Sequence, residues 1–377
     1  MPMITDPFPL IEISGAPRER GRQYGEQSAE RIARGIKIYR RRLEVRGKDW
    51  LKVCNYAENF STFLDQSVPE CMEEMKGIAE GAGVDIAHVL VINARTELMY
   101  GHQTTAESFP NDGCTSIVVL PERSSDGCLL HGQNWDWITD CVDTGVVLRI
   151  RPDYGPDILT FAEAGQLARC GFNANGISIS GNFLESDADM RAQGWALPLA
   201  IIRRLALEAS NYHDSLKAVF QSSKMFSNNM VVSHMDGESY SLEATPEEVF
   251  WVEPENGLLV HANHFQSLSA QCKIRDTGIP DSPDSLYRLR RTRNALESLE
   301  KISIEDLKTA FKDDFGTPYS VCRPPIPGRY GDRGSASVAT IIMKPSKGLM
   351  WIAPAPWEKG EFTQYSINAS ADISATV

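Results

Sequence analysis

The chain has 377 residues, of which 42% are hydrophobic, so it can bury a large core as one domain or as two. Its formal net charge of −12 argues against a nucleic-acid binder, because a phosphate backbone is held by clustered Lys and Arg. No run of about 18 apolar residues marks a membrane span, and the N-terminus has no secretory signal pattern. We therefore expect a cytoplasmic protein with neither nucleic acid nor membrane as a partner.

The first hundred residues have the pattern of helices. Apolar residues recur at turns of a 3.6-residue period from residue 18 to about residue 100. Gly81 and Gly83 are expected to end one of these helices, and 85–100 is predicted to form one further, mostly buried helix. Residues 101–112 are rich in turn formers and are predicted as a polar loop.

From Cys114 onward the pattern changes to short β-rich runs separated by turn residues. The predicted strands are 114–120, 128–137, 144–152, 157–165, 176–184, 228–244, 248–253, 257–265, 337–343 and 348–354, and the predicted helices are 197–210, 212–223, 285–300 and 303–314. The strand spacing is that of antiparallel hairpins and excludes an alternating βαβ sheet. Ser303 is expected to cap the last helix. Blocks of helices beside blocks of antiparallel strands indicate an α+β fold with sheets between helical layers.

Several functional patterns are absent or weak. Two basic runs, 39–48 and 287–297, are interpreted as solvated helix faces. The eight cysteines have no metal-ligand spacing, and His261 and His264 lack the glutamate of a metalloprotease motif, so we expect no metal. The serine-hydrolase elbow and the P-loop are also missing from the sequence. A thiol nucleophile is the interpretation that remains.

Cys114 stands between Gly113 and the β-branched run of the first strand of this region. A thiol needs a base or a positive field to act at neutral pH. If the bond before Cys114 is cut, the released α-amine supplies that base on the same residue. Gly113 suits the cut, since a residue without Cβ allows the strained backbone in which the thiol reaches its carbonyl. The alternative is a buried, inert cysteine at the start of a strand.

Short blocks such as "NDGCTS", "GQNWDW", "GFNANGISISGN" and "HANHF" occur in the order typical of one enzyme family. The chain resembles, from about residue 13 to 355, the penicillin acyltransferase family of autoproteolytic N-terminal-nucleophile (Ntn) hydrolases. The resemblance implies an Ntn-hydrolase αββα sandwich with two antiparallel sheets between helical layers. It also implies that self-cleavage releases residues 1–113 as a helical α-subunit, which stays bound to the strand-rich β-subunit 114–377.

The resemblance also implies roles for single residues. Cys114 is the nucleophile, Asp136 is the carboxylate beside it, and Asn263 is the oxyanion-hole amide. Arg333 is expected to be the active-site arginine, and Arg323 is its competitor.

Five further side chains have expected positions. We expect Trp135 and Phe172 to line an apolar substrate pocket together with Ser227, although aromatic residues near strand ends also belong to cores. Arg95 and Glu243 are interpreted as members of structural ion pairs.

The predicted function is hydrolysis of a linear amide bond in a small N-acyl compound, through an acyl-thioester on Cys114 and without a cofactor. One alternative is an N-acyltransferase that moves an acyl group from an amide or from a thioester, such as a coenzyme A thioester, to an amine. A second alternative is an uncleaved, non-catalytic binding protein on the same fold. The sequence ends without the peroxisomal tripeptide expected of the fungal penicillin enzyme and has no recognisable coenzyme A site, which argues against penicillin synthesis.

Overall fold

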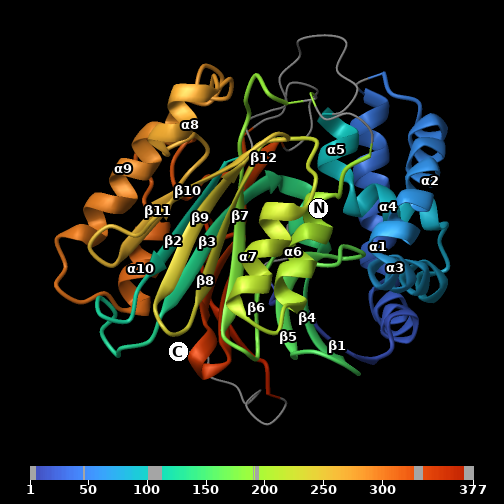
Figure 1. Ribbon diagram of the computed structural model, residues 1–377, viewed down its shortest axis with the longest axis horizontal. Coiled ribbons are helices and arrows are strands. Elements are labelled where there is room, and N and C mark those ends of the chain that lie inside the picture. The colour runs from blue at the N-terminus through green and yellow to red at the C-terminus, as the bar shows by residue number, and fades with distance from the viewer. Residues whose placement is uncertain are drawn as a thin grey trace.

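Two β-sheets lie face to face between two layers of helices (Figure 1). The computed structural model describes residues 6–45, 47–100, 113–189, 191, 195–326 and 334–368. The larger sheet contains, in spatial order, β1 (Leu10–Gly15), β4 (Gly145–Pro152), β5 (Ile158–Glu163), β6 (Cys170–Asn173), β7 (Ile177–Phe183), β8 (Asn228–His234), β9 (Glu238–Ala244) and β10 (Val249–Val252). The smaller sheet contains β11 (Leu258–His261), β2 (Cys114–Val119), β3 (Leu130–Ile138), β12 (Ser335–Lys344), β13 (Leu349–Pro354) and β14 (Thr363–Ser366).

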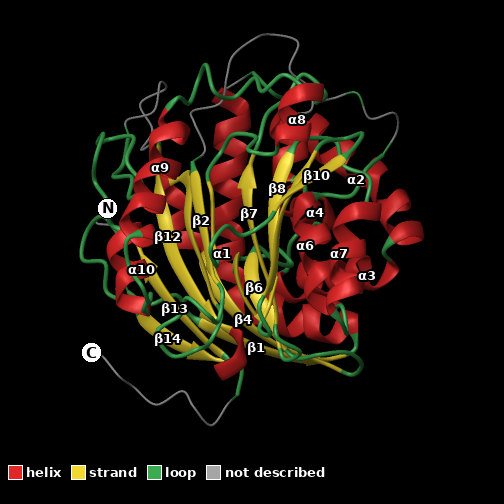
Figure 2. Cartoon of the chain, turned by 60° about the vertical axis from the view of Figure 1, so that its left-hand side comes forward, coloured by secondary structure: helices red, strands yellow, loops and turns green. Residues whose placement is uncertain are grey.

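The helices divide between the outer faces of the two sheets (Figure 2). On the side of the larger sheet are α1 (Pro17–Val45), α2 (Trp50–Ser67), α3 (Pro69–Ala82), α4 (Ile86–Asn93), α5 (Arg95–Tyr100), α6 (Leu199–Glu208) and α7 (Tyr212–Gln221). The smaller sheet is covered by α9 (Asp284–Glu297) and α10 (Ile304–Phe311), while α8 (Leu268–Lys273) follows β11. Two 3₁₀ helices occupy Thr139–Thr144 and Pro345–Lys347. Within these described ranges, no helix has both the length and the apolar content needed to cross a membrane.

The layered α+β architecture and the antiparallel hairpins predicted from the sequence are confirmed. Strands β2 and β3 are buried along their whole length, because one face packs on the other sheet and the opposite face is covered by helices. Ser303 caps α10 as expected, since its hydroxyl oxygen accepts the N–H of Asp306 while the Asp306 carboxylate accepts the N–H of Ser303.

Some elements differ from the prediction. The helix expected over 85–100 is two helices, because the chain leaves the helical conformation at Ala94. The side chain of Asn93, just before this break, is fixed by hydrogen bonds to the backbone of Gly165 and Leu167. Strands β1, β6 and β14 and helix α8 were not predicted, since each is only four to six residues long. The loop predicted over 101–112 lies outside the described residues.

Helices α1 and α3 pack with their backbones in close contact, and glycines make this possible. A Cβ on Gly21 would lie 2.1 Å from the carbonyl oxygen of Glu74, and a Cβ on Gly81 would lie 2.1 Å from that of Arg22. Because α3 continues through Gly81 to Ala82, the expectation that Gly81 ends the helix is wrong. Gly83 does end α3, with a φ of 65° that favours glycine.

This contact predicts opposite effects for two glycine-to-alanine substitutions in α1. Gly21→Ala should lower the free energy of unfolding by about 1–3 kcal/mol, because the new methyl overlaps the α3 backbone. Gly35→Ala should raise it by roughly 0.5–1 kcal/mol, since its Cβ would meet only a Thr144 methyl at 3.8 Å and alanine favours the helix. Urea unfolding of both variants measures the two changes, and equal effects would contradict the packing argument.

Candidate active site

Cys114 is the first residue of β2 and is buried between the two sheets, with 2% of its surface exposed. In the antiparallel pairing of β2 with β3, Cys114 lies opposite Trp135. The pairing continues one residue before β2, where the N–H of Asp136 donates to the carbonyl oxygen of Gly113 at 2.9 Å. Strand register therefore brings Asp136 to the peptide bond that precedes Cys114.

Gly113 lies against two charged side chains. A Cβ built on this residue would be 2.4 Å from Oδ2 of Asp136 and 2.8 Å from Nη2 of Arg323. Any other residue at this position would force the carboxylate or the guanidinium to move. The structure thus requires glycine here for space.

The Asp136 carboxyl group is completely buried. Its Oδ1 accepts a 2.5 Å hydrogen bond from the hydroxyl of Ser337 in β12, and its Oδ2 lies 3.9 Å from Nε of Arg323. Burial raises the pKa of Asp136, while the positive charges of Arg323 and Arg288 oppose the rise. A buried carboxyl group with a raised pKa can exchange a proton beside the Gly113 carbonyl.

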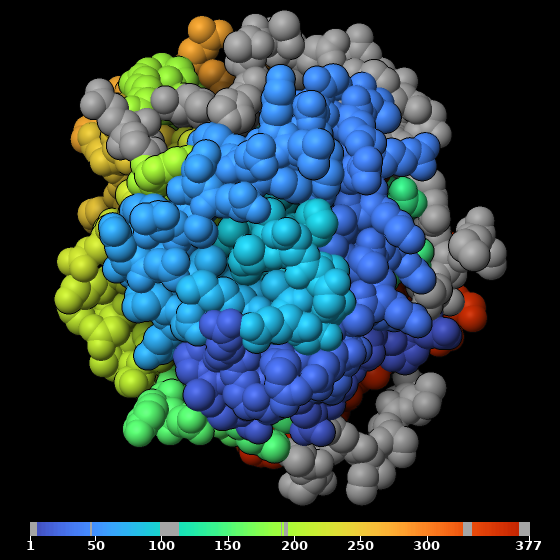
Figure 3. Space-filling view, turned by 90° about the vertical axis from the view of Figure 1, so that its right-hand side faces the viewer, coloured from blue at the N-terminus to red at the C-terminus, as the bar shows by residue number. Residues whose placement is uncertain are grey.

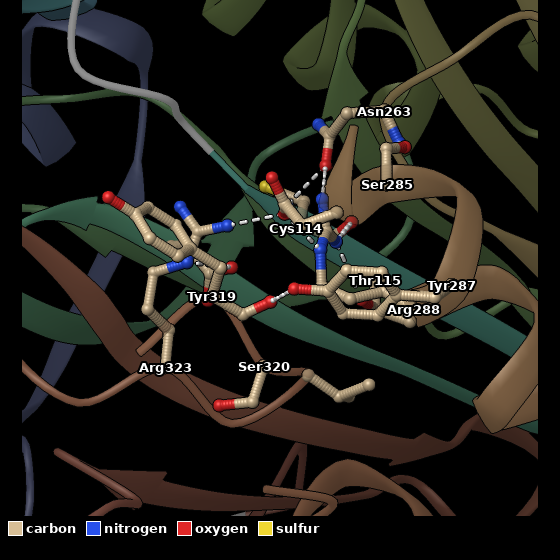
Figure 4. A network of polar contacts seen from close by, with 12 residues as sticks. Cys114, Thr115, Asn263, Ser285, Tyr287, Arg288, Tyr319, Ser320 and Arg323 are labelled. Carbon is tan, nitrogen blue, oxygen red and sulfur yellow. Dashed lines mark hydrogen bonds and ion pairs between the residues drawn. The ribbon is translucent and has the colours of Figure 1, made fainter. Parts of the chain in front are cut away.

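Asn263 follows β11 and meets the other side of the same peptide bond. The N–H of Cys114 donates to Oδ1 of Asn263 at 2.7 Å. The Asn263 amide nitrogen donates to the carbonyl oxygen of Phe183 at 2.9 Å, and the Asn263 backbone N–H donates to the hydroxyl oxygen of Ser285 at 2.7 Å. These bonds fix both the side chain and the backbone of Asn263, which lies beside Cys114 and Ser285 in Figure 4.

Arg288 in α9 is the main functional candidate that the sequence interpretation missed. It belongs to the run 287–297, which was expected to be a solvated face, yet its side chain is fully buried. Nη1 donates to the carbonyl oxygen of Cys114 at 2.9 Å, and Nη2 donates to Oδ1 of Asn263 at 2.8 Å (Figure 4). Only part of this run faces solvent, and the expectation for Arg288 is wrong.

A signal for Arg288 was present in the sequence. Asp284, Arg288 and Thr292 are spaced at i, i+4 and i+8, so they lie on one helix face, and Leu296 extends that face. All four residues are buried. When an apolar residue lies on the same helix face as a charged residue, that face is expected to be turned toward the protein interior.

Arg323, the competitor in the sequence analysis, lies in this site. Its Nη2 donates to Oδ2 of Asp284 at 2.8 Å, and Nε of Arg288 donates to the same oxygen at 2.8 Å. A continuous row of buried charges thus connects Asp136 through Arg323 and Asp284 to Arg288. Arg333 lies outside the described residues.

The other predicted site residues lie in three different settings. Trp135 is beside Cys114, and Cζ of Arg169 lies 4.4 Å from the centre of its ring. Phe172 in β6 is fully buried in the main apolar core. Ser227 donates to Oδ1 of Asp189 at 2.6 Å and lies 2.8 Å from the Ser186 hydroxyl.

Arg95 forms the expected ion pair, with Glu163 at 2.6 Å. Oε1 of Glu243 lies 2.8 Å from Nε2 of His261, a contact that is an ion pair only when the imidazole is protonated. His264 instead contacts the hydroxyl of Ser285 at 2.7 Å. In the part of the chain that the structure describes, no group of three or more His, Cys, Asp or Glu side chains could hold a metal ion.

Known proteins match this chain over most of its length. A sequence model of the family described as acyl-coenzyme A:6-aminopenicillanic acid acyl-transferase matches residues 123–355, more than half of the chain. The acyl-coenzyme A:6-aminopenicillanic-acid-acyltransferase 40 kDa form of Emericella nidulans is 27% identical over 330 residues, covering 86% of this chain and 87% of the relative. A crystal structure of a variant of the conjugated bile acid hydrolase from Clostridium perfringens superposes with a TM-score of 0.50 at 14% identity, covering 68% of this chain and 93% of that one. The expected Ntn-hydrolase αββα sandwich is thereby confirmed.

Proposed function

The chain belongs to the acyl-coenzyme A:6-aminopenicillanic acid acyl-transferase family, and on this premise we propose that it is a self-processing Ntn hydrolase. Its reaction is the cleavage of a linear amide bond in a small N-acyl compound, with Cys114 as the nucleophile. One observation carries the proposal: both sides of the Gly113–Cys114 bond are held. The carbonyl oxygen accepts the Asp136 N–H, and the amide N–H donates to Asn263.

Maturation begins with attack of the Cys114 thiol on the carbonyl carbon of Gly113. The C–N bond breaks as the C–S bond forms, and the thiol proton is transferred to the departing nitrogen. A thioester between Gly113 and the Cys114 side chain thereby replaces the peptide bond. Water then hydrolyses this thioester and leaves a carboxylate on Gly113 and an amine on Cys114. The Asp136 N–H stabilises the negative charge that develops on the Gly113 oxygen, and the buried Asp136 carboxyl relays the proton.

In the matured enzyme the new α-amine is the base for each turnover. The amine of Cys114 still donates a hydrogen bond to Oδ1 of Asn263, and Arg288 donates to that same oxygen. The positive charge of Arg288 disfavours a second positive charge nearby, so the amine stays unprotonated more readily and can accept the thiol proton. The amine then passes this proton to the leaving nitrogen of the substrate, and water releases the acyl group as an acid.

Asn263 has a further role during attack on the substrate. One N–H of its side-chain amide donates to Phe183, and the second is available for the oxyanion of the tetrahedral intermediate. Removal of such a donor costs other enzymes about 3 kcal/mol of transition-state stabilisation. We assign Asn263 to the oxyanion hole on this basis.

Residues 1–113 stay bound after cleavage in this proposal. Strand β1 pairs with β4 at one edge of the larger sheet, and α1 to α5 cover one face of the molecule (Figure 3). The buried carboxylate of Glu74 in α3 pairs with Arg204 in α6 at 2.7 Å. Separating the fragments would expose a sheet edge and break buried ion pairs.

Transfer of the acyl group to an amine is the second candidate function. It is favoured by the name of the Emericella relative, which is an acyltransferase that uses an acyl-coenzyme A. Hydrolysis and transfer share the acyl-thioester on Cys114 and differ only in the nucleophile that attacks it. We propose that either reaction takes place in the cytoplasm, whose reducing conditions suit a thiol nucleophile, and that it needs no cofactor.

A product assay tests the proposal and separates the two reactions. The purified protein is incubated with a panel of N-acyl amines, and mass spectrometry follows the acyl adduct on fragment 114–377 together with free acid and new amide. We expect an adduct on Cys114, free acid as the main product, and new amide only at high concentrations of added amine. Saturation by amine at low concentration with little acid would favour the transferase. Absence of any adduct or product would favour a non-catalytic binding protein, and a Cys272→Ala variant controls for the exposed thiol.

A further inference from the structure

Two buried arginines besides Arg288 belong to the surroundings of the Cys114 thiol: Arg169 contacts the sulfur, and Arg203 interacts electrostatically with Cys114 and Arg169. Arg169 immediately precedes β6, and its Nη2 is 3.5 Å from the sulfur of Cys114. Arg203 in α6 lies against the backbone of β7, where a Cβ on Gly181 would be 2.7 Å from Nη2 of Arg203. The two side chains are 5% and 3% exposed, respectively.

Neither guanidinium has a carboxylate within ion-pair distance among the residues that the structure describes. Within the described residues, the hydrogen bond to Cys114 is the only one that the Arg169 guanidinium makes, and its Nε has no partner. Arg203 donates from Nη2 to Oδ1 of Asn228 at 3.3 Å, and its Nε also has no partner. A buried arginine usually has several such bonds, because its charge is costly to remove from water.

The two carboxylates of this region, those of Glu163 and Glu97, form hydrogen bonds with groups other than Arg169 and Arg203. Glu163 binds Arg95 and the hydroxyl of Tyr39, both at 2.6 Å. Glu97 accepts the N–H of Leu199 at 2.9 Å, and burial raises its pKa. Among the described residues of this region, the three arginines Arg95, Arg169 and Arg203 outnumber the two carboxylates of Glu163 and Glu97. This difference leaves an excess of positive charge next to the thiol.

Both arginines remain charged under ordinary conditions. Burial lowers the pKa of Arg169, and burial together with the charges of Arg169 and Arg95 lowers the pKa of Arg203 to about 9. At neutral pH each guanidinium therefore carries its proton and its charge. The negative charge of a Cys114 thiolate raises the pKa of both guanidinium groups, whereas burial lowers it. An anion at this place would stabilise the pair.

We propose that Arg169 and Arg203 form an anion subsite that binds a carboxylate carried by the substrate close to its reactive carbonyl. The inference deepens the proposed function, because it takes Cys114 as the nucleophile and specifies the class of N-acyl compound. A carboxylate bound to Arg169 at a usual distance of about 2.8 Å lies within roughly 6 Å of the sulfur. It is therefore a few bonds from the carbon that the sulfur attacks, either in the acyl group or in the leaving amine.

Alkylation of Cys114 tests the subsite without a turnover assay. Iodoacetate and iodoacetamide have the same reacting carbon, from which the thiolate displaces iodide, but only iodoacetate carries a carboxylate. Both reagents use the same thiolate, so the ratio of their rates does not depend on the pKa of the thiol. Peptide mass spectrometry measures this ratio for Cys114 and, as an internal reference in the same chain, for the exposed Cys272. We expect the iodoacetate preference at Cys114 to exceed that at Cys272 by about tenfold or more, and to fall with added salt.

Variants then assign the effect to its side chains. Arg203→Gln should reduce the preference several-fold, while Arg203→Lys, which keeps the charge, should retain most of it. Arg290→Gln, at an exposed position of α9, should leave it unchanged. Equal preference at Cys114 and Cys272, or a preference that survives Arg203→Gln, would overturn the subsite.

A binding measurement covers the case in which neither reagent reaches Cys114, an outcome that would count against the proposed function. Malonate, compared with chloride at equal ionic strength, should raise the Tm of the wild-type protein and of Arg203→Lys, because an anion that binds only the folded state stabilises it. The rise should be absent in Arg203→Gln. No difference between malonate and chloride would overturn the subsite whatever the thiol does.

Two N-acyl substrate pairs then locate the carboxylate. An N-acylglycine is compared with its glycinamide, and an N-succinyl amide with its N-butanoyl analogue. Preference for the charged member within the first pair places the carboxylate in the leaving amine, and within the second pair it places the carboxylate in the acyl group. No preference in either pair contradicts the inference.

Discussion

Replacing Cys114 with alanine is expected to leave the purified chain as one polypeptide of 377 residues, whereas the wild-type chain runs as fragments 1–113 and 114–377 that co-purify. The reason is that no thiol remains to attack the Gly113 carbonyl, so the amide cannot rearrange to a thioester. Turnover should be lost as well, because the same sulfur forms the acyl-enzyme. A denaturing gel, intact mass and N-terminal sequencing of the larger fragment measure the result.

Two further variants make this prediction specific. Cys272→Ala, which removes an exposed thiol, should be cleaved like the wild type. Gly113→Ala should be cleaved slowly or not at all, since its Cβ would lie 2.4 Å from Oδ2 of Asp136 and displace the groups beside the scissile bond. An active wild-type sample that shows only the mass of the uncleaved chain would contradict the self-processing proposal.

Arg288→Met should both destabilise the protein and stop maturation. The substitution leaves the buried Asp284 carboxylate with one guanidinium in place of two and removes the donors to Cys114 and Asn263. Breaking a buried ion pair by removing one partner typically costs about 3–5 kcal/mol. We expect a loss of this size in the free energy of unfolding, measured by urea, and a mostly uncut chain on a denaturing gel.

Arg290→Met is the matched control for this substitution. Arg290 is exposed on the same helix, two residues away, so its replacement should change the free energy of unfolding by less than about 0.5 kcal/mol and leave cleavage normal. If Arg288→Met matures at the wild-type rate, the row of buried charges does not position the scissile bond.

The candidate nucleophile and the carboxylate beside it could be predicted from short blocks of sequence. Cys114 follows a glycine at the start of a β-branched run, and Asp136 lies in the next predicted strand. Hairpin pairing of these two strands is local, with Cys114 opposite Trp135, and it places Asp136 beside Gly113. Local periodicity and turn residues are sufficient for this step, because consecutive antiparallel strands usually pair.

The groups that surround this pair of residues were decided by contacts between distant segments. Arg288 reaches Cys114 across 174 positions of sequence, and Arg323 reaches Asp284 across 39. Arg169 meets the thiol across 55 positions, from a turn that the strand pattern did not resolve.

Most element types, the layered α+β class and the choice of Cys114 as the candidate nucleophile could be predicted from the sequence, because these predictions depend on periodicity, turn chemistry and short motifs. Which buried charges face Cys114 depends instead on contacts between distant segments of the fold. A run of basic residues shows that a helix is charged, but not which of its arginines turns inward. That choice depends on whether a carboxylate or carbonyl from another element meets the arginine and compensates the cost of removing its charge from water. For Arg288 these partners come from Asp284, Asn263 and the Cys114 carbonyl.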